Sequence, residues 1–307
     1  MKRGNFNQGY IESDYTVEGY YDAYNYDAAA LLKNNSFQAN RRALYHKTVE
    51  GGKTKYRYDF VLTPNLGFLA DSMPLLNNCE LKLSFDRAPG STSLLRVKGT
   101  DDAPYLEIKD CHAVTEWVSS PEIVEVFEDI EHNPIIYKYD EVEVLCKPLP
   151  MHERVIRLDN IKRGNIPKYI FAAIIPTSAI NGDVTKSSTC FGCYGVEECN
   201  LTLNGHSVNG YPINVHEGSD TNVMYQFNDT IGRLHNNSCG YGMKKSQFQT
   251  NFIWAHHFEA KTTNHGLIEM EIKLKNALAS SYSMVVWLIA PSSVSIDKYH
   301  NVERKNF

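Results

Sequence analysis

The sequence holds 307 residues, of which 42% are apolar and 22% are charged. This balance is apolar enough to build a buried core and excludes a chain that is disordered throughout. The formal net charge of −5 argues against a protein that coats nucleic acid, because such a protein needs a basic face to neutralise phosphates.

The start of the chain and its cysteines bear on where the protein works. Residues 1–6 lack the apolar core of a secretory signal, and no stretch reaches the roughly 18 apolar residues that a membrane helix requires. The seven cysteines are odd in number and scattered, which favours reduced thiols over a disulfide framework. We therefore expect a protein that is not secreted, has no membrane span and resides in the cytoplasm or nucleus.

Residues 1–50 differ from the rest of the chain. They are rich in tyrosine among Gly, Asn and Asp, and they show little alternation of apolar and polar residues. The run Asp27–Lys33 favours two turns of helix, since Ala and Leu are strong helix formers. We interpret residues 1–50 as a long arm or loop, a length that is typical of a functional or interface segment.

Between residues 51 and 150, apolar and polar residues alternate in short runs, which is the pattern of half-buried strands. The clearest run is Cys79–Phe85. The other strands predicted in this part are Tyr56–Leu62, Tyr105–Lys109, His112–Val118 and Asp140–Cys146. A short helix is expected at Pro121–Phe127, because proline suits a first helical turn. Pro148 and Pro150 close the last strand and indicate a domain boundary at about residue 150.

The second half repeats the strand pattern. The apolar run Tyr169–Ile175 predicts a strand buried on both faces. Val196–Leu203 alternates and meets Asn204-Gly205, a strong hairpin signal. The spacing over Asn222–Leu234 predicts a helix. The remaining predicted strands are Arg154–Leu158, Asn251–Phe258, Gly266–Leu274, Ser283–Ile289 and Val294–Ile296. Many short strands at near-regular spacing predict an all-β protein, an antiparallel sandwich or jelly roll with short helices in its loops.

Two clusters of metal-binding residue types are candidate sites. Cys190 and Cys193 have metal-site spacing, and Cys199 and Cys239 complete a possible set of four zinc ligands; partly buried free thiols are the favoured alternative. His256 and His257 are adjacent on a predicted strand, so their side chains point to opposite faces and do not share one ion.

Motifs of catalysis are missing from the sequence. Gly240–Ser246 lacks the glycine spacing of a phosphate loop, and no nucleophile elbow or zinc-protease motif occurs. Adjacent acidic pairs such as Asp101-Asp102 and Glu197-Glu198 cannot face each other across a substrate. We therefore predict no catalytic residue, no cofactor site and no metal site, and a protein that is not an enzyme.

Several segments, taken in order, resemble the major capsid proteins of Polinton/Maverick elements and of their adintovirus and virophage relatives. Tyr58–Gly67 and Pro74–Leu83 are similar to late strands of the first jelly roll in that family. Arg163–Phe171 resembles the strand entry after the linker between the rolls, and Gly195–Gly205 resembles the strand and turn that follow. Ile296–Val302 is similar to the closing strand. The resemblance covers roughly residues 50 to 307.

The resemblance implies a double jelly roll whose first roll lacks its opening strands. The expected division is a tyrosine-rich arm at 1–50, a partial N-terminal jelly roll at 51–150 and a C-terminal jelly roll at 151–307. A shortened gene model, a decayed copy in a host genome and a divergent member all remain open.

The resemblance also implies a function. The expected protein is a major capsid protein that forms pseudo-hexagonal homotrimers, which tile an icosahedral shell together with a penton protein. It would reside in the virion after assembly in the host cytoplasm or nucleus, without sequence-specific nucleic-acid binding. The alternatives are a single-jelly-roll minor capsid (penton) protein and a host-retained jelly-roll binding module, for example for glycans. Trp117, Trp254 and Trp287 are far apart in sequence and indicate no aromatic site of the kind that a glycan module needs.

Overall fold

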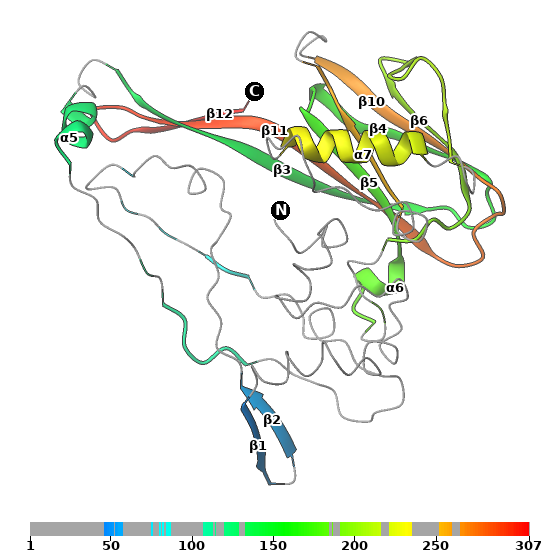
Figure 1. Ribbon diagram of the computed structural model, residues 1–307, viewed down its shortest axis with the longest axis horizontal. Coiled ribbons are helices and arrows are strands. Elements are labelled where there is room, and N and C mark those ends of the chain that lie inside the picture. Colours follow the sequence, from blue (N-terminus) through cyan, green and yellow to red (C-terminus); the bar gives the residue numbers. More distant parts are fainter. Residues whose placement is uncertain are drawn as a thin grey trace.

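The computed structural model describes residues 133–183, 191–215, 221–234, 252–259 and 265–306 almost without interruption. Before and between these ranges it describes residues 46–51, 53–57, 107–112 and 120–128 and the single or short positions 75, 80, 82, 84–86, 114 and 186. The larger ranges form two antiparallel sheets that pack face to face (Figure 1).

The first sheet is built around one long central strand, β11. Its order is β3-β11-β5-β9, and β12 pairs with the far half of β11 beyond the end of β5. The bounds are β3 (Ile135–Leu149), β5 (Tyr169–Pro176), β9 (Ile253–His257), β11 (Tyr282–Ile296) and β12 (Val302–Asn306).

The second sheet has the order β4-β10-β6, and two short strands, β7 and β8, share the free edge of β6. The bounds are β4 (Val155–Asn165), β6 (Val196–Leu203), β7 (His206–Ser207), β8 (Ile213–Asn214) and β10 (His265–Leu274). The turn between β6 and β7 consists of Asn204 and Gly205, with φ of 53° and 79°. Two residues in the left-handed region make a type I′ turn, which closes the hairpin that the sequence predicts.

The order of the strands identifies the sandwich as a jelly roll. The chain alternates between the sheets from β3 to β6 and again from β9 to β11. Each sheet thereby interleaves early strands with late ones: β11 lies between β3 and β5, and β10 lies between β4 and β6. This is the arrangement of two Greek keys wound into paired four-stranded sheets. The predicted all-β jelly-roll class is confirmed.

The two sheets differ in what covers their outer faces. On the β4-β10-β6 sheet, Ile156, Met270 and Leu201 point inward and are buried, while Arg157 and Glu271 pair on the outer face at 2.7 Å. The first sheet is covered on both faces around β5, every residue of which is buried except Pro176. A continuous apolar run is the sequence that such a strand requires.

A helix accounts for the second covered face of β5. Helix α7 (Thr221–Leu234) buries Val223, Phe227, Thr230 and Ile231, which recur at helical spacing. The ring of Phe227 meets that of Phe171 edge to face, with centroids 6.4 Å apart. The predicted helix at Asn222–Leu234 is confirmed, and so is the strand buried on both faces.

Beyond the sandwich, three strands continue as a narrow ribbon, which we call the strand ribbon: Ile135–Asp140 of β3, Ser292–Ile296 of β11 and β12. Figure 1 shows it running out to helix α5 (Pro121–Glu128), which matches the helix predicted at Pro121–Phe127. The ribbon has a small core of its own, formed by Ile135, Tyr137 and Ile296, against which Leu75 and Val294 pack.

Several expectations about the first 150 residues are corrected. The strand predicted at Asp140–Cys146 is longer and pairs with β11 along its whole length, so it belongs to the C-terminal sandwich and not to an N-terminal roll. It runs through Pro148, where we expected it to end. Among the described strands β3 is an edge strand, and an edge is where a sheet tolerates proline.

The strand predicted at Cys79–Phe85 is not formed at its described positions. None of Glu80, Lys82, Ser84 and Phe85 lies in a strand, and Phe85 is 62% exposed. The described residues of Tyr105–Lys109 and His112–Val118 are also outside strands. By contrast, the end of the predicted arm carries strand β1 (His46–Glu50), which forms a hairpin with β2 (Lys53–Arg57). Residues 1–45, with the predicted helix, and residues 58–67 lie outside the described residues.

At the end of the chain two predicted strands prove to be one. Ser283–Ile289 and Val294–Ile296 are parts of β11, which continues through Pro291. Residues 297–301, inside the segment that resembles a closing strand, form the turn between β11 and β12. Asp297 builds this turn by accepting hydrogen bonds from the backbone N–H groups of Tyr299 and Asn301, both at 2.9 Å.

Candidate functional site

The cysteines singled out by the sequence are only partly described. Cys190 and Cys239 lie outside the described residues, whereas Cys193 and Cys199 lie within them. Cys199 is buried on the inner face of β6, where it is opposite Ile272 and Ile213. Burial raises the pKa of its thiol to about 12, so Cys199 is protonated at neutral pH and a poor metal ligand or nucleophile.

The two histidines lie on opposite faces of β9, as strand geometry predicts. His256 is opposite Ile170 on the inner face, between the rings of Trp254 and Phe258 at centroid distances of 6.1 and 4.9 Å. His257 lies on the outer face under α7, with Nδ1 3.7 Å from Oδ2 of Asp229. Burial, with a smaller contribution from His257, lowers the pKa of His256 to about 4.

The described part of the chain contains no group of three or more His, Cys, Asp and Glu side chains that could hold a metal ion. The Gly240–Ser246 loop lies outside the described residues. Among the described helices none is long and apolar enough to cross a membrane. What the described residues offer is a rigid sandwich and the surfaces around it.

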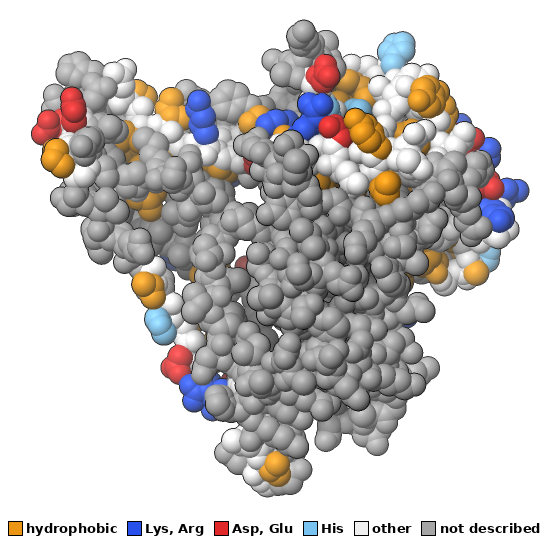
Figure 2. Space-filling view, in the orientation of Figure 1, with side chains coloured by type: hydrophobic (Ala, Val, Ile, Leu, Met, Phe, Trp, Pro, Cys, Tyr) orange, Lys and Arg blue, Asp and Glu red, His pale blue; other side chains and the backbone are white. Residues whose placement is uncertain are grey.

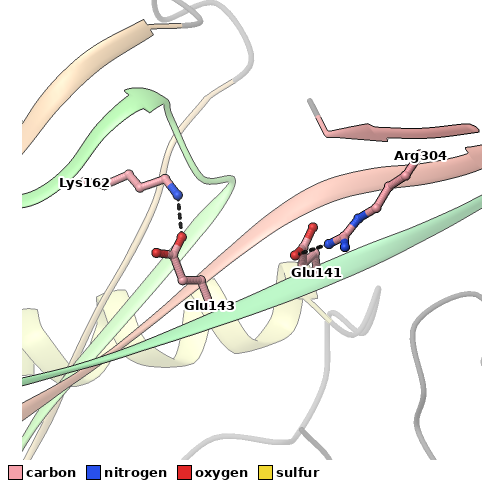
Figure 3. A network of polar contacts seen from close by, with 4 residues as sticks. All are labelled: Glu141, Glu143, Lys162 and Arg304. Atoms are coloured by element: carbon pink, nitrogen blue, oxygen red, sulfur yellow. Dashed lines mark hydrogen bonds and ion pairs between the residues drawn. The ribbon is translucent and has the colours of Figure 1, made fainter. Parts of the chain in front are cut away.

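The strand ribbon is joined to the sandwich by two ion pairs on one face of β3. Glu143 pairs with Lys162 of β4, which belongs to the opposite sheet, and Glu141 pairs with Arg304 of β12 (Figure 3). Both carboxylates lie on the inner face of β3, in series with the buried Tyr137 and with Leu145, which packs on the core. The hydrogen bond between Arg304 and Glu141 and the charge of Glu141 raise the pKa of the guanidinium, which stabilises the charged form of Arg304.

The outer face of β3 carries exposed apolar side chains on either side of Lys138 and Asp140. Ile136, Val142 and Val144 are 47%, 40% and 55% exposed, and Cys146 on the same face is exposed as well. Figure 2 shows acidic side chains at the far end of the ribbon, over α5, and mixed charges on the sandwich. The helix there carries Glu125 and Glu128, both exposed. An apolar flank beside charged ends is a surface suited to contacts between proteins.

Sequence reasoning missed these surface features for one reason. The alternation over Asp140–Cys146 predicts a strand, but alternation alone does not indicate which face of the strand lies toward the other sheet. In the structure the glutamates face inward, because at this point the inner face meets Lys162 and Arg304 instead of an apolar layer. The signal that could have indicated this arrangement is the presence of two acidic residues, Glu141 and Glu143, in a strand whose two ends are buried.

No family model matches the sequence, and no curated protein matches it. Among solved structures, the chain is similar to a chain of the Sputnik virophage, at 14% identity and a TM-score of 0.35 over 56% of this chain and 39% of that one. It is similar to the PBCV-1 virus capsid at 9% identity and a TM-score of 0.34, over 57% and 51%. It is also similar to the mavirus major capsid protein at 8% identity and a TM-score of 0.33, over 62% and 44%. The chain thus spans about half or less of the solved chains it matches.

Proposed function

We propose that this chain is a structural subunit of a viral or virus-like capsid. The observation that carries the proposal is the strand order of the C-terminal sandwich, β3-β11-β5-β9 against β4-β10-β6-β7. This jelly roll arises in a sequence whose segments resemble, in order, those of double-jelly-roll capsid proteins. Jelly rolls occur in proteins of many functions, so the fold alone does not indicate a capsid protein. The order of the segments that resemble capsid proteins narrows the functional class.

The geometry of the sandwich suits a shell component. Two pleated sheets share one apolar core, and β5 and β11 are buried along most of their length, which makes the unit stiff. The β4-β10-β6 sheet presents a polar outer face with ion pairs such as Lys273–Glu198 at 3.2 Å. The outer face of β3 and the strand ribbon present apolar area. A rigid unit whose two sides differ in this way can contact copies of itself around a symmetry axis and form a closed ring.

The finer proposal is a double jelly roll of the Polinton/Maverick kind. Because β3 belongs to the C-terminal sandwich, we propose that the partial N-terminal roll ends before Ile135 and that the tyrosine-rich arm at 1–50 precedes it. The subunit would form pseudo-hexagonal homotrimers and meet a penton protein at the shell vertices. Its role would be structural and not enzymatic, in a virion assembled in the host cytoplasm or nucleus.

The deciding experiment is the mass of the purified full chain by light scattering, with negative-stain images of the same fractions. A species of three times 34.9 kDa, or shells, is the expected result. A pentamer would move the assignment to the single-jelly-roll penton protein. A clean monomer at high concentration would contradict the capsid proposal and favour a host-retained binding module.

The arm is the proposed contact element between subunits, since tyrosines supply large rigid contact area at small entropic cost. Deletion of residues 1–45 leaves the β1–β2 hairpin and the sandwich in place. The expected product is a soluble monomer. If the shortened protein still forms trimers, the arm is not the contact element, whereas the capsid proposal stands.

A further inference from the structure

A surface pocket lies where the edge of the second sheet is interrupted. Strands β7 and β8 both pair with β6, and residues 208–212 between them leave the sheet edge. The pocket occupies this break, next to the first turns of α7, and has a volume of about 330 Å³. Its size lies at the lower end of the range for small-molecule sites. Its lining includes four amide side chains and two tyrosines: Asn209, Asn214, Asn222, Gln226, Tyr211 and Tyr225.

The break is held by defined backbone geometry. Val208 N–H donates to the carbonyl of Leu201 at 2.9 Å, and Gly210 N–H donates to the carbonyl of Ser207 at 3.1 Å. Gly210 has a φ of 77°, a conformation in which glycine is unstrained. The pocket wall is therefore shaped by the fold before any ligand arrives.

Two amides at this wall leave their hydrogen bonding incomplete. Nε2 of Gln226 donates to Oδ1 of Asn209 at 3.1 Å. The other atoms, Nδ2 of Asn209 and Oε1 of Gln226, are buried and find no partner among the described residues. Turning both amides over only exchanges the roles, so one N–H donor and one oxygen acceptor are always left. Each such group left unsatisfied destabilises the protein, because it has lost its hydrogen bonds to water without gaining others.

The chemistry of the missing partner follows from this pair. A hydroxyl donates one hydrogen bond and accepts others, so its chemistry matches the one donor and the one acceptor that the two amides leave over. The lining residues include no charged side chain, which gives an anionic or cationic ligand no counter-charge. Two further amides, Asn214 and Asn222, offer donors and acceptors to neighbouring hydroxyls.

The rim of the pocket adds two aromatic rings. Tyr211 and Tyr225 are 65% and 70% exposed, although large aromatic rings are costly to leave in water. The C–H face of a pyranose ring packs on such rings while its hydroxyls reach amides. A glycan-binding site needs exposed aromatic rings beside convergent polar groups. The three tryptophans of the sequence do not indicate such a site, whereas the two tyrosines and the amides of this pocket do.

We propose that this pocket binds a neutral carbohydrate of one or two sugar rings. The pyranose face packs on Tyr225 and Tyr211, and a hydroxyl bridges Asn209 and Gln226 after a rotation of either amide. The assignment stands whether or not the chain builds a shell, so failure of one proposal leaves the other intact. On a capsid, such a site would attach the particle to glycans of a cell surface.

The test is saturation-transfer-difference NMR on the full chain. The probes are neutral mono- and disaccharides of glucose, galactose, mannose and N-acetylglucosamine, each at about 10 mM, which detects affinities in the millimolar range. Sialyllactose and a sulfated disaccharide serve as anionic probes. At least one neutral sugar is expected to give transfer to its ring protons. The proposal is overturned if no neutral sugar receives saturation from the protein, or if only the anionic probes receive it.

Substitutions then locate the site. Tyr225→Ala and Gln226→Met are expected to weaken binding at least about tenfold. Tyr225 is exposed, and Gln226→Met keeps the side-chain length, so both variants are expected to fold, which thermal melting verifies. The matched control is Tyr299→Ala, which removes a tyrosine of similar exposure (72%) from the β11–β12 turn. Binding that survives both pocket variants, or is lost equally in the control, contradicts the assignment.

Discussion

Glu141 and Glu143 are two residues apart on one face of β3, yet their side chains form ion pairs with two different parts of the fold. Lys162 belongs to the opposite sheet of the sandwich, whereas Arg304 belongs to the last strand of the chain. The pair therefore marks the point at which β3 leaves the sandwich and enters the strand ribbon. On β11, the same point is at Ala290 and Pro291. These two residues lie between the part of β11 that pairs with β5 and the part that pairs with β12.

The first prediction separates the two glutamates. Glu141→Gln is expected to loosen β12 alone, because Arg304 then loses its charged partner while the sandwich keeps its own. Glu143→Gln is expected to lower the free energy of unfolding of the whole sandwich by about 0.2–1 kcal/mol, the usual value of a partly exposed ion pair. Amide hydrogen exchange checks this: protection falls over Val302–Asn306 in the first variant and not in the second. Asp140→Asn, on the opposite face of β3, is the control and should change neither.

The second prediction concerns the cover that α7 provides. Phe227 is 1% exposed and meets Phe171 of β5, so Phe227→Ala removes a buried ring from the core. We expect a loss of about 3–5 kcal/mol in the free energy of unfolding, measured by urea titration. Tyr225→Ala on the same helix removes an exposed ring and should change stability by less than about 0.5 kcal/mol. Equal effects of the two variants would show that α7 does not pack on the sheet.

The elements that sequence analysis predicted well carry their information locally. Tyr169–Ile175 is apolar at every position because it is covered twice, by the opposite sheet and by α7. Asn204-Gly205 predicts its hairpin because few residue pairs adopt two positive φ values in a row. Asn222–Leu234 predicts a helix because its apolar residues recur at helical spacing. In each case the pattern and the environment coincide within a few residues.

The errors arise where a strand depends on distant partners. Cys79–Phe85 alternates well, but alternation forms a strand only if another strand pairs with it, and at its described positions it forms none. The strand at Ile135–Leu149 is real, yet its partner is β11, about 150 residues further along the chain. Because the sequence alone does not show that pairing, we predicted this strand as part of the N-terminal roll, whereas it pairs within the C-terminal sandwich. The carbohydrate pocket has no local signal either, because its lining comes from a broken edge strand and a helix.

The third prediction uses the cysteines. Cys199 has a pKa raised to about 12 by burial, whereas Cys111 and Cys146 are exposed. At pH 8 a maleimide reagent should therefore label Cys146 and Cys111 within minutes and leave Cys199 unmodified in the folded protein. Peptide mass spectrometry locates the label, and labelling of all three in urea is the positive control. Rapid modification of Cys199 under native conditions would mean that β6 is not packed as described.

The fourth prediction follows from His256. Burial lowers the pKa of this imidazole from 6.5 to about 4, so the folded chain holds it neutral while the unfolded chain takes up a proton below pH 6.5. Stability from this group is therefore complete above pH 6.5 and is lost as the pH falls toward 4. Between pH 7 and pH 5 the loss is about 2 kcal/mol, on the order of 1.4 kcal/mol for each unit below the unfolded pKa.

His257 adds to the same trend, because burial and the charge of Arg233 lower its pKa, while Asp229 and Glu259 oppose this. His256→Gln should remove most of the pH dependence, since glutamine stays neutral between Trp254 and Phe258. His257→Gln should remove less, and His206→Gln, at an exposed position, is the control. Urea unfolding of each variant at pH 7 and pH 5 gives the comparison. An undiminished loss of stability in His256→Gln would place the titrating group elsewhere, whereas a selective reduction would identify β9 as the acid-sensitive strand of the jelly roll.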